Sequence, residues 1–303
     1  MNTENAITTR GLTKHYRDVV AVDGLDLEVR RGEIYGFLGR NGAGKTTTIR
    51  MLLGLVRPSA GEVRVLGTLM RPGTTDVLAR VGFLVETATA YPNLTVRENL
   101  EIQRRLTGAP RSAVTDVITQ MQLDSQADRR AGVLSLGNKQ RLSLARALVH
   151  NPDVLLLDEP ANALDPAGIV EIRELLRSLA DGQGVTVFIS SHILAEIAHL
   201  ADRIGIVHHG RLLEEIDREE LHRRARPYVE VGVNDTGRAE ALLTAAGLAP
   251  IEHADGNLRV FHAEQRVPEI ARLLIGAGLD LTLLAPGRED LESYFLRRTG
   301  GEG

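Results

Sequence analysis

A short stretch near the start of the chain has the residue types and the spacing of a phosphate-binding loop. The pattern G-x-x-x-x-G-K-[ST] is matched by Gly39, Gly42, Gly44, Lys45 and Thr46. Residues 34–38 before it form an apolar run typical of a strand, and residues 45–55 have helical periodicity. Glycines let backbone N–H groups curl around an anion, and the new helix points its positive end at the same place. The pattern predicts a nucleoside triphosphate site; the alternative is an ordinary glycine-rich turn.

Two of these side chains and two acidic residues farther along the chain have the chemistry to bind phosphate and Mg²⁺ and to activate a water molecule for hydrolysis. Lys45 would place its charge on the β- and γ-phosphates, and the Thr46 hydroxyl would bind Mg²⁺. Residues 154–157 are a continuous aliphatic run, typical of a buried parallel strand, that ends in Asp158 and Glu159. Because ligands bind at the carboxyl ends of such strands, we expect Asp158 to hold Mg²⁺ through water and Glu159 to activate the attacking water. The alternative is a solvated acidic turn.

Two further segments could meet phosphate oxygens. Ser135 and Gly137 stand at the start of an amphipathic helix predicted over residues 138–149, and a helix N-terminus favours anions. Taken alone, Ser135 is more often a simple N-cap. His192 follows a buried strand predicted at residues 185–190 and could reach a γ-phosphate, although a lone histidine at a strand end is usually structural.

The motifs occur in the order found in the ATP-binding subunits of ABC transporters, and the chain resembles those subunits over residues 7–215. The resemblance identifies residues 39–47 as the Walker A loop, and so adds to the expected ATP contacts Asn41, Ala43 and Thr47. It identifies residues 134–138 as the signature motif. It also identifies residues 154–159 as the Walker B strand, with Glu159 as the catalytic glutamate.

Further site residues follow from the same resemblance. His192 is similar to the switch histidine, and Asp165 ends a segment, N-A-L-D, that is similar to the D-loop. Tyr16 falls where the family keeps an aromatic ring that stacks on adenine; the alternative is a half-buried strand tyrosine. Glu86 stands where most of the family has a glutamine that links Mg²⁺ to the membrane partner. A carboxylate binds Mg²⁺ more strongly than an amide does, so Glu86 is an expected metal ligand, but its negative charge beside the γ-phosphate could also slow hydrolysis, and both outcomes remain open.

Other segments resemble one branch of the family, the bacterial drug, bacitracin and lantibiotic-immunity exporters. They are Y-P-N-L-T-V-R-E-N-L, S-L-G-N-K-Q-R-L and E-P-A-N-A-L-D-P. The signature departs from the usual L-S-G-G-Q, because Leu136 replaces the first glycine and Asn138 replaces the glutamine. Ser135 and Gly137 remain, so we still expect the phosphate contact, made by a stiffer loop.

The elements that must position these residues indicate an α/β fold, a P-loop NTPase of ABC type. Residues 6–29 are predicted to form short strands of a small antiparallel sheet. Residues 95–150 are predicted as a helical insert, with helices at 96–106, 111–123 and 138–149. Around it, alternating strands and helices predict a parallel core sheet covered on both faces, which ends in a hairpin at residues 203–214.

Three parts are expected along the chain: an ABC ATPase domain at residues 1–216, a linker at 217–227 and an accessory α/β domain at 228–303. In the last part, strands are predicted at 228–233, 258–262 and 279–284. They alternate with helices predicted at 238–246, 267–277 and 290–298. Subunit pairing, regulation and simple packing all remain open as its role.

Composition argues against several other classes of protein. The chain has 303 residues, of which 43% are hydrophobic and 25% charged, as in ordinary soluble globular proteins. A formal net charge of −4 gives no reason to expect nucleic-acid binding, and the absence of cysteine excludes disulfides. The start does not have the layout of a signal peptide, and no apolar run approaches about 18 residues, so no direct membrane insertion is expected.

The resemblance implies an ATPase that works as a dimer, with ATP and Mg²⁺ as cofactors. The signature of one subunit would close over the ATP held by the other, so that the polyphosphate lies between two helix N-termini. The expected partners are a second ATPase subunit, in a homodimer, and a separate transmembrane permease that docks near residues 86–105. We expect a cytoplasmic subunit on the inner face of the cell membrane that energises efflux of a drug or antimicrobial peptide.

The alternative function is a soluble ABC-type module that acts on the ribosome or on DNA. The sequence contains one phosphate loop, whereas translation factors of this type usually have two such domains. It also has no long coiled coil before the signature, which DNA-maintenance proteins of this type insert.

Overall fold

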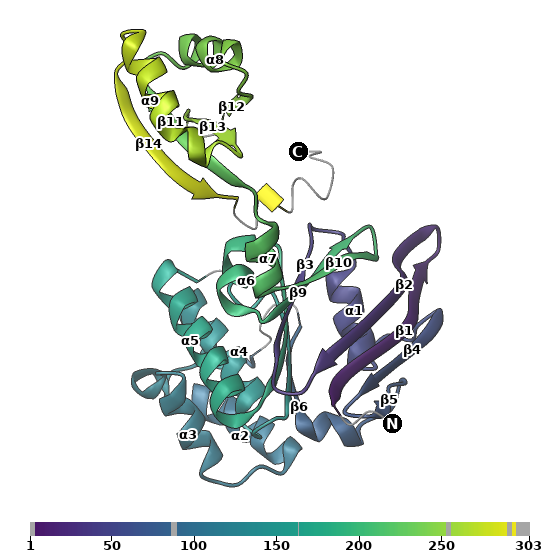
Figure 1. The fold of residues 1–303 in the computed structure, drawn as a ribbon. Coiled ribbons are helices and arrows are strands. Elements are labelled where there is room, and N and C mark those ends of the chain that lie inside the picture. Colours follow the sequence, from purple (N-terminus) through teal and green to yellow (C-terminus); the bar gives the residue numbers. More distant parts are fainter. Residues whose placement is uncertain (1–3, 86–89, 163, 253–255, 290–292, 295–303) are drawn as a thin grey trace. The chain divides into compact units, whose positions relative to one another are not determined.

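The computed structural model describes residues 4–85, 90–162, 164–252, 256–289 and 293–294. The chain divides into two compact units, which we call unit 1 (Met1–Arg218) and unit 2 (Glu219–Gly303) (Figure 1). Each has its own cluster of buried apolar side chains, and so each has the organisation of a domain.

A mostly parallel sheet forms the centre of unit 1, with strands in the order β10-β9-β3-β8-β7-β6. Their bounds are β3 Ile34–Leu38, β6 Val81–Leu84, β7 Val154–Asp158, β8 Thr186–Ser191, β9 Arg203–His208 and β10 Arg211–Asp217. Every residue of β3, β7 and β8 is buried, as expected for aliphatic strands covered on both faces. β9 and β10 pair in antiparallel fashion, which confirms the predicted hairpin.

Unit 1 also contains an antiparallel sheet, in the order β2-β1-β4-β5. Its strands are β1 Asn5–Tyr16, β2 Val19–Arg30, β4 Ala60–Val65 and β5 Thr68–Leu69. This sheet was predicted, but the prediction that residues 6–29 form short strands was wrong. Gly24 lies inside β2 with a φ of 63°, and Gly11 lies inside β1 with a φ of 55°. The β1–β2 register shifts near both glycines, so they kink long strands rather than end short ones.

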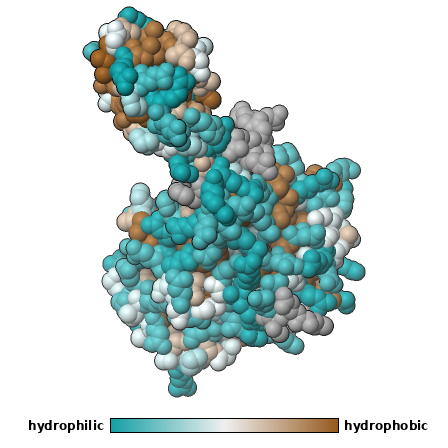
Figure 2. Space-filling model, viewed as in Figure 1, coloured by the Kyte–Doolittle hydropathy of each residue, from teal (hydrophilic) through white to brown (hydrophobic). Residues whose placement is uncertain are grey.

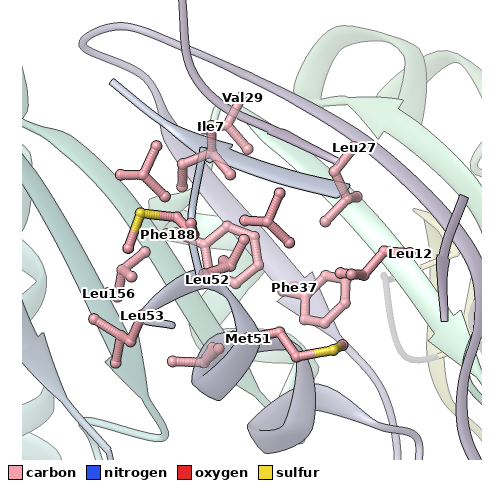
Figure 3. Packing of buried hydrophobic residues seen from close by; sticks show 14 of the residues in the cluster. Ile7, Leu12, Leu27, Val29, Phe37, Met51, Leu52, Leu53, Leu156 and Phe188 are labelled. Atoms are coloured by element: carbon pink, nitrogen blue, oxygen red, sulfur yellow. The ribbon is translucent and has the colours of Figure 1, made fainter. Parts of the chain in front are cut away.

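The core of unit 1 joins both sheets to helix α1 (Lys45–Leu52). Figure 3 shows Leu52 of α1 close to Phe37 and Phe188 of the central sheet, with Leu27 and Val29 of β2 nearby. All five side chains are almost completely buried. Burial of one such side chain contributes about 1.5–3 kcal/mol, so α1 and the loop before it are fixed by this core.

The predicted helical insert contains α2 (Val96–Thr107), α3 (Ala113–Gln120) and α4 (Leu136–Leu148). α2 begins where predicted because Thr95 and Glu98 form a capping box at its N-terminus. α4 begins at Leu136 rather than at residue 138, because the Ser135 hydroxyl accepts the backbone N–H of Asn138 and caps the helix. α5 (Pro166–Gln183) follows β7, and α6 (Leu194–Leu200) follows β8.

Unit 2 folds around an antiparallel sheet in the order β12-β13-β11-β14. Its elements are β11 Pro227–Val233, α8 Thr236–Ala245, β12 Pro250–Glu252, β13 Leu258–Phe261, α9 Val267–Gly276 and β14 Leu281–Arg288. α7 (Arg218–Arg224) begins at the boundary between the units and occupies most of the predicted linker. β12 was not predicted, because three residues are too few for an alternating pattern. The helix predicted at 290–298 falls almost wholly outside the described residues.

The face of unit 1 that is turned to the viewer in Figure 2 is largely hydrophilic. Among the helices in the described ranges, none combines the length and the apolar character needed to cross a bilayer.

Candidate active site

Three segments of unit 1 meet at one edge of the central sheet. The glycine-rich loop follows β3, Asp158 ends β7, and β8 ends just before His192. β8 lies between the other two strands, since Leu38 pairs with Ser191 and Asp158 pairs with Ser190. Because these strands are parallel, their carboxyl ends share one edge, where open α/β sheets bind ligands. The topology therefore brings together segments that are far apart in the sequence.

Two glycines of the loop stand where no other residue would fit. Gly44 has a φ of 101°, and a Cβ there would lie 2.3 Å from the carbonyl oxygen of Ala21. A Cβ on Gly39 would lie 2.6 Å from the carbonyl oxygen of Val207. Gly42 also has a left-handed φ, 82°, but a Cβ there would meet open space. The loop is therefore pressed against β2 and β9 on one side and open at its tip.

The tip and the first turn of α1 offer backbone N–H groups. Asn41 and Gly42 are exposed, whereas Ala43 is buried and its carbonyl accepts the N–H of Gly210. No side chain caps α1 at Gly44, while Ser135 caps α4 in the usual way. The first N–H groups of a helix, here at and around Thr47, have no partner inside the helix. This end is suited to an anion.

Lys45 is the cation of the site, and its side chain is only 6% exposed. Its Nζ donates to the carbonyl oxygens of Gly39 and Arg40, at 2.7 and 3.3 Å. It also lies 3.3 Å from Oε1 of Glu159. Within the described ranges the ammonium therefore pairs with one carboxylate, that of Glu159, and a phosphate oxygen could take its place.

Thr46, Asp158 and Ser190 form a chain of hydrogen bonds beside Lys45. The Thr46 hydroxyl donates to Oδ2 of Asp158 at 2.7 Å. The Ser190 hydroxyl donates to Oδ1 of the same carboxylate at 2.5 Å. The sequence motifs do not identify Ser190, because a serine inside a buried strand belongs to no motif; the available signal was its place two residues before His192.

Glu159 and His192 are joined directly, as Nδ1 of His192 contacts Oε2 of Glu159. The amide of Asn162 donates to the same oxygen at 3.2 Å. Glu159 therefore lies between Lys45 on one side and His192 on the other. Its φ of 51° is left-handed, a strained conformation for a non-glycine residue and one that clusters at functional sites.

The oxygen donors present fit a hard divalent cation such as Mg²⁺. Thr46 and Asp158 place a hydroxyl and a carboxylate side by side, within hydrogen-bonding distance. Among the described residues there is no group of three or more histidine, cysteine, aspartate or glutamate side chains that could hold a metal. Mg²⁺ is commonly bound through one or two protein oxygens completed by phosphate oxygens and water, so this donor set suits a nucleotide-bound metal. Glu86, the remaining predicted ligand, lies outside the described residues.

The other predicted phosphate contacts are not brought to Lys45 within this chain. In the described part of the chain, Ser135 and Gly137 make no hydrogen bond to the glycine-rich loop, and the Ser135 hydroxyl serves as the α4 cap. Asp165 caps α5, since its Oδ1 accepts the N–H of Gly168 at 2.9 Å. Their contact with ATP remains a prediction that needs a second chain.

Tyr16 lies at the end of β1, and its side chain is 42% exposed. Lys14 Nζ lies 4.9 Å from the ring centroid. The hairpin that carries Tyr16 passes beside the loop, because the carbonyl of Ala21 in β2 lies next to Gly44. The open ring is therefore on an element that borders the phosphate loop, and adenine stacking remains a prediction.

The strand that carries the loop is tied to the edge of the sheet by Tyr35. The Tyr35 hydroxyl donates to Oε1 of Glu215 in β10 at 2.6 Å. Burial raises the pKa of Tyr35 well above its usual value, and the charge of Glu215 adds to the rise. A Cβ on Gly205 would lie 2.2 Å from the hydroxyl oxygen, so glycine in β9 leaves room for this bond.

Comparison with known proteins adds a family and full-length relatives to this geometry. The sequence model of the ABC transporter family matches residues 22–162. The bacitracin transport ATP-binding protein BcrA of Bacillus licheniformis is 43% identical over 298 residues, which cover 97% of each chain. BcrA of Enterococcus faecalis is 42% identical over 99% of this chain and 98% of its own length. The daunorubicin resistance ATP-binding protein DrrA3 of Streptomyces coeruleorubidus is 36% identical over 99% of this chain and 97% of its own.

Comparison of folds identifies solved structures that match part of the chain. A dimeric structure of the ATP-binding cassette MJ0796, in a post-hydrolysis state with ADP and Pi, has a TM-score of 0.65 and 26% identity. It covers 70% of this chain and 98% of its own. This cassette and the family match confirm the fold class predicted from the sequence for the larger part of the chain, the α/β fold of an ABC-type P-loop NTPase.

Proposed function

Because the chain belongs to the family of ABC transporter ATP-binding subunits, we propose that it hydrolyses ATP to power an exporter of a drug or peptide antibiotic. The observation that carries the proposal is the cluster of Lys45, Asp158, Glu159 and His192 at one sheet edge. The full-length relatives named for bacitracin transport and daunorubicin resistance support the cargo class. The alternative of a ribosome- or DNA-directed module is not favoured, because these relatives are transporter or drug-resistance proteins.

In the proposed reaction the loop and the start of α1 bind the phosphates, and Lys45 adds its charge. Phosphate oxygens would compete with Glu159 for Lys45. Oε1 of Glu159 would then be free to accept a proton from the attacking water, while His192 holds Oε2. Mg²⁺, held by Thr46 and Asp158, would neutralise charge on the phosphate oxygens.

The proposed working unit is a dimer of two copies. Ser135 and Gly137 do not reach the loop within one chain, although they stand at an uncrowded helix N-terminus: a Cβ built on Gly137 would meet Leu164 at 3.7 Å. A second copy arranged head to tail would bring them to the γ-phosphate, with Asp165 nearby. Loss of the γ-phosphate would remove the contact made by the signature residues of the second copy. ATP would therefore bind the closed dimer more tightly than ADP does, and this difference in binding is what drives a conformational cycle.

A separate membrane permease completes the proposed assembly. The expected location is therefore the inner face of the cell membrane, reached through the permease. Purification of the chain from its native membranes would test this: co-purification of a multi-spanning membrane protein supports the proposal, and co-purification of ribosomes or DNA contradicts it.

Glu159→Gln tests the reaction itself. The amide cannot accept a proton from water, so we expect ATP hydrolysis to fall by at least about 100-fold while ATP binding is retained. We also expect ATP to convert the variant into a stable dimer, visible by size-exclusion chromatography with light scattering. Hydrolysis at the parent rate would mean that Glu159 is not the base, and a monomer at saturating ATP would contradict the dimer.

A further inference from the structure

Ser190 connects the two acidic residues of the site, although it lies on a different strand. Its hydroxyl donates to Oδ1 of Asp158 at 2.5 Å. The backbone N–H of Glu159 donates to the same hydroxyl oxygen at 3.2 Å, and also to the Ser190 carbonyl oxygen at 3.2 Å. Ser190 has no exposed surface, so water does not compete for these bonds.

The direction of both hydroxyl bonds is fixed by chemistry. An ionised carboxylate only accepts hydrogen bonds, and a serine hydroxyl has a single proton to donate. The proton of Ser190 must therefore point to Asp158, which leaves an oxygen lone pair for the N–H of Glu159. The hydroxyl is held from both sides.

In this arrangement the two carboxylate oxygens of Asp158 have different roles: Oδ2 faces Thr46 and the proposed metal, and Oδ1 accepts the hydrogen bond of Ser190. Among the described residues, the side-chain donors to this carboxylate are Thr46 on Oδ2 and Ser190 on Oδ1. A metal held by Thr46 and Asp158 would replace the bond between them, because the same oxygens would turn to the metal. The Ser190 bond does not involve the Thr46 side, so it would keep the carboxylate oriented throughout.

For Glu159, the same serine holds the backbone at the point where the strand ends. Glu159 has a left-handed φ of 51°, which a non-glycine residue adopts only when its surroundings require it. The N–H bonds to Ser190 are part of those surroundings, and the resulting turn directs the carboxylate to Lys45 and His192.

The neighbouring serine has a different bond. The Ser191 hydroxyl accepts the N–H of Ile193 at 2.9 Å, in the turn after β8. Successive residues of a strand point to opposite faces, which is why two adjacent serines have different partners.

We propose that Ser190 is a positioning residue for the proposed ATPase, which holds the metal-binding carboxylate of Asp158 and the backbone of Glu159 in one fixed arrangement. The inference rests on the proposed function and adds to it a residue that touches neither nucleotide nor metal. On this proposal the loop and Lys45 determine the affinity for the nucleotide without metal. Ser190 determines how much Mg²⁺ increases that affinity.

The test measures binding of a fluorescent ATP analogue to the full chain, in EDTA and across a Mg²⁺ titration. For Ser190→Ala we expect unchanged affinity in EDTA and a rise of about tenfold in the half-saturating Mg²⁺ concentration, because a buried hydrogen bond to a charged group is lost. The turnover number should fall as well. Ser190→Thr retains the hydroxyl and should recover most of the Mg²⁺ response.

Thr186→Val is the matched control. Thr186 is buried on the same strand, and its hydroxyl accepts the N–H of Gly32 at 3.0 Å, at the end away from the site. Both Thr186→Val and Ser190→Ala lose a buried hydrogen bond, so we expect both to lower the melting temperature. Thr186→Val should nevertheless show the same Mg²⁺ titration as the parent.

Three results would overturn the inference: a parental Mg²⁺ response in Ser190→Ala, an equal shift in Thr186→Val, or an equal loss of affinity with and without Mg²⁺. The first two leave the proposed function intact, provided the parent chain binds and hydrolyses ATP. A parent chain that binds no nucleotide would instead refute the proposed function, and the role of Ser190 with it.

Discussion

The partners of Lys45 indicate how much its side chain would contribute to ATP binding. Its ammonium is almost buried and is satisfied by two carbonyl oxygens and the carboxylate of Glu159. A buried ammonium is stable only when hydrogen-bond acceptors or an opposite charge surround it. The acceptors around Lys45 therefore hold its positive charge beside the glycine-rich loop. Replacing the carboxylate with a phosphate oxygen would preserve the charge balance of the pocket.

Lys45→Ala should therefore weaken ATP binding by about 10- to 100-fold, since charge-assisted hydrogen bonds contribute about 1.5–3 kcal/mol. Isothermal titration calorimetry of the parent and the variant measures this directly. Circular dichroism should show the same fold in both, because the α1 core does not include the ammonium. An unchanged affinity would mean that the nucleotide binds elsewhere.

At the level of single residues, the sequence predicts the groups that belong to motifs and misses those that depend on strand order. Lys45, Asp158 and His192 were found because each follows a recognisable strand, and the structure brings them to one edge. The sequence does not predict Ser190, because its proposed role depends on β8 lying between β3 and β7, which no local pattern encodes. The left-handed turn at Glu159 is likewise set by its neighbours.

Among the elements, the strand–loop–helix unit around Gly44 leaves no room for a side chain at its centre. Its φ of 101° and the contact with Ala21 exclude any side chain. Gly44→Ala should lower the free energy of unfolding by more than the roughly 1–2 kcal/mol expected for a left-handed residue, because the Cβ also displaces β2 from the loop. Nucleotide binding should be lost too, as the N–H groups change direction.

Gly67→Ala is the control, because it measures the loss of stability from a left-handed backbone conformation without a steric clash of the new Cβ. Gly67 also has a left-handed φ, 82°, but a Cβ there meets nothing within 4 Å. Urea unfolding should show a smaller loss of stability for Gly67→Ala than for Gly44→Ala, and ATP affinity should stay at the parental value. Equal losses in the two variants would contradict the close approach of β2 to the loop.

The elements themselves were predictable where a single pattern extends over a whole segment. The aliphatic strands β7 and β8 and the periodic helices α2 and α4 fall close to their predicted ranges. The predictions fail where a glycine permits a bend without ending a strand, as Gly11 and Gly24 do in β1 and β2. They also fail where a strand is as short as β12, because pairing with β13 rather than local propensity creates it.

At the scale of the whole molecule, the arrangement of one chain leaves its proposed site incomplete. Lys45 and Glu159 belong to one cluster, whereas Gly137 makes no contact with that cluster in the described part of the chain. A head-to-tail dimer would form each site from the loop of one copy and the signature of the other. Each dimer then has two sites, and each chain contributes a different half to each of them.

This arrangement predicts that two inactive variants restore each other. Lys45→Ala removes the cation from the loop half, and Gly137→Asp places a carboxylate where the γ-phosphate would meet the signature half. Gly137 has room for a side chain, since the nearest atom to its Cβ is Leu164 Cδ2 at 3.7 Å, so the variant should fold. In a mixed dimer both defects fall in one site, and the other site is intact.

An equal mixture of these two variants should therefore recover roughly one quarter of the parental ATPase rate, since half of the dimers are mixed and each has one good site. Lys45→Ala mixed with Glu159→Gln is the control: both changes lie in the loop half, so every site keeps a defect and activity should stay low. A steady-state phosphate-release assay distinguishes the two mixtures. If the first mixture is no more active than the second, the two halves of the site come from the same chain and the head-to-tail dimer is wrong.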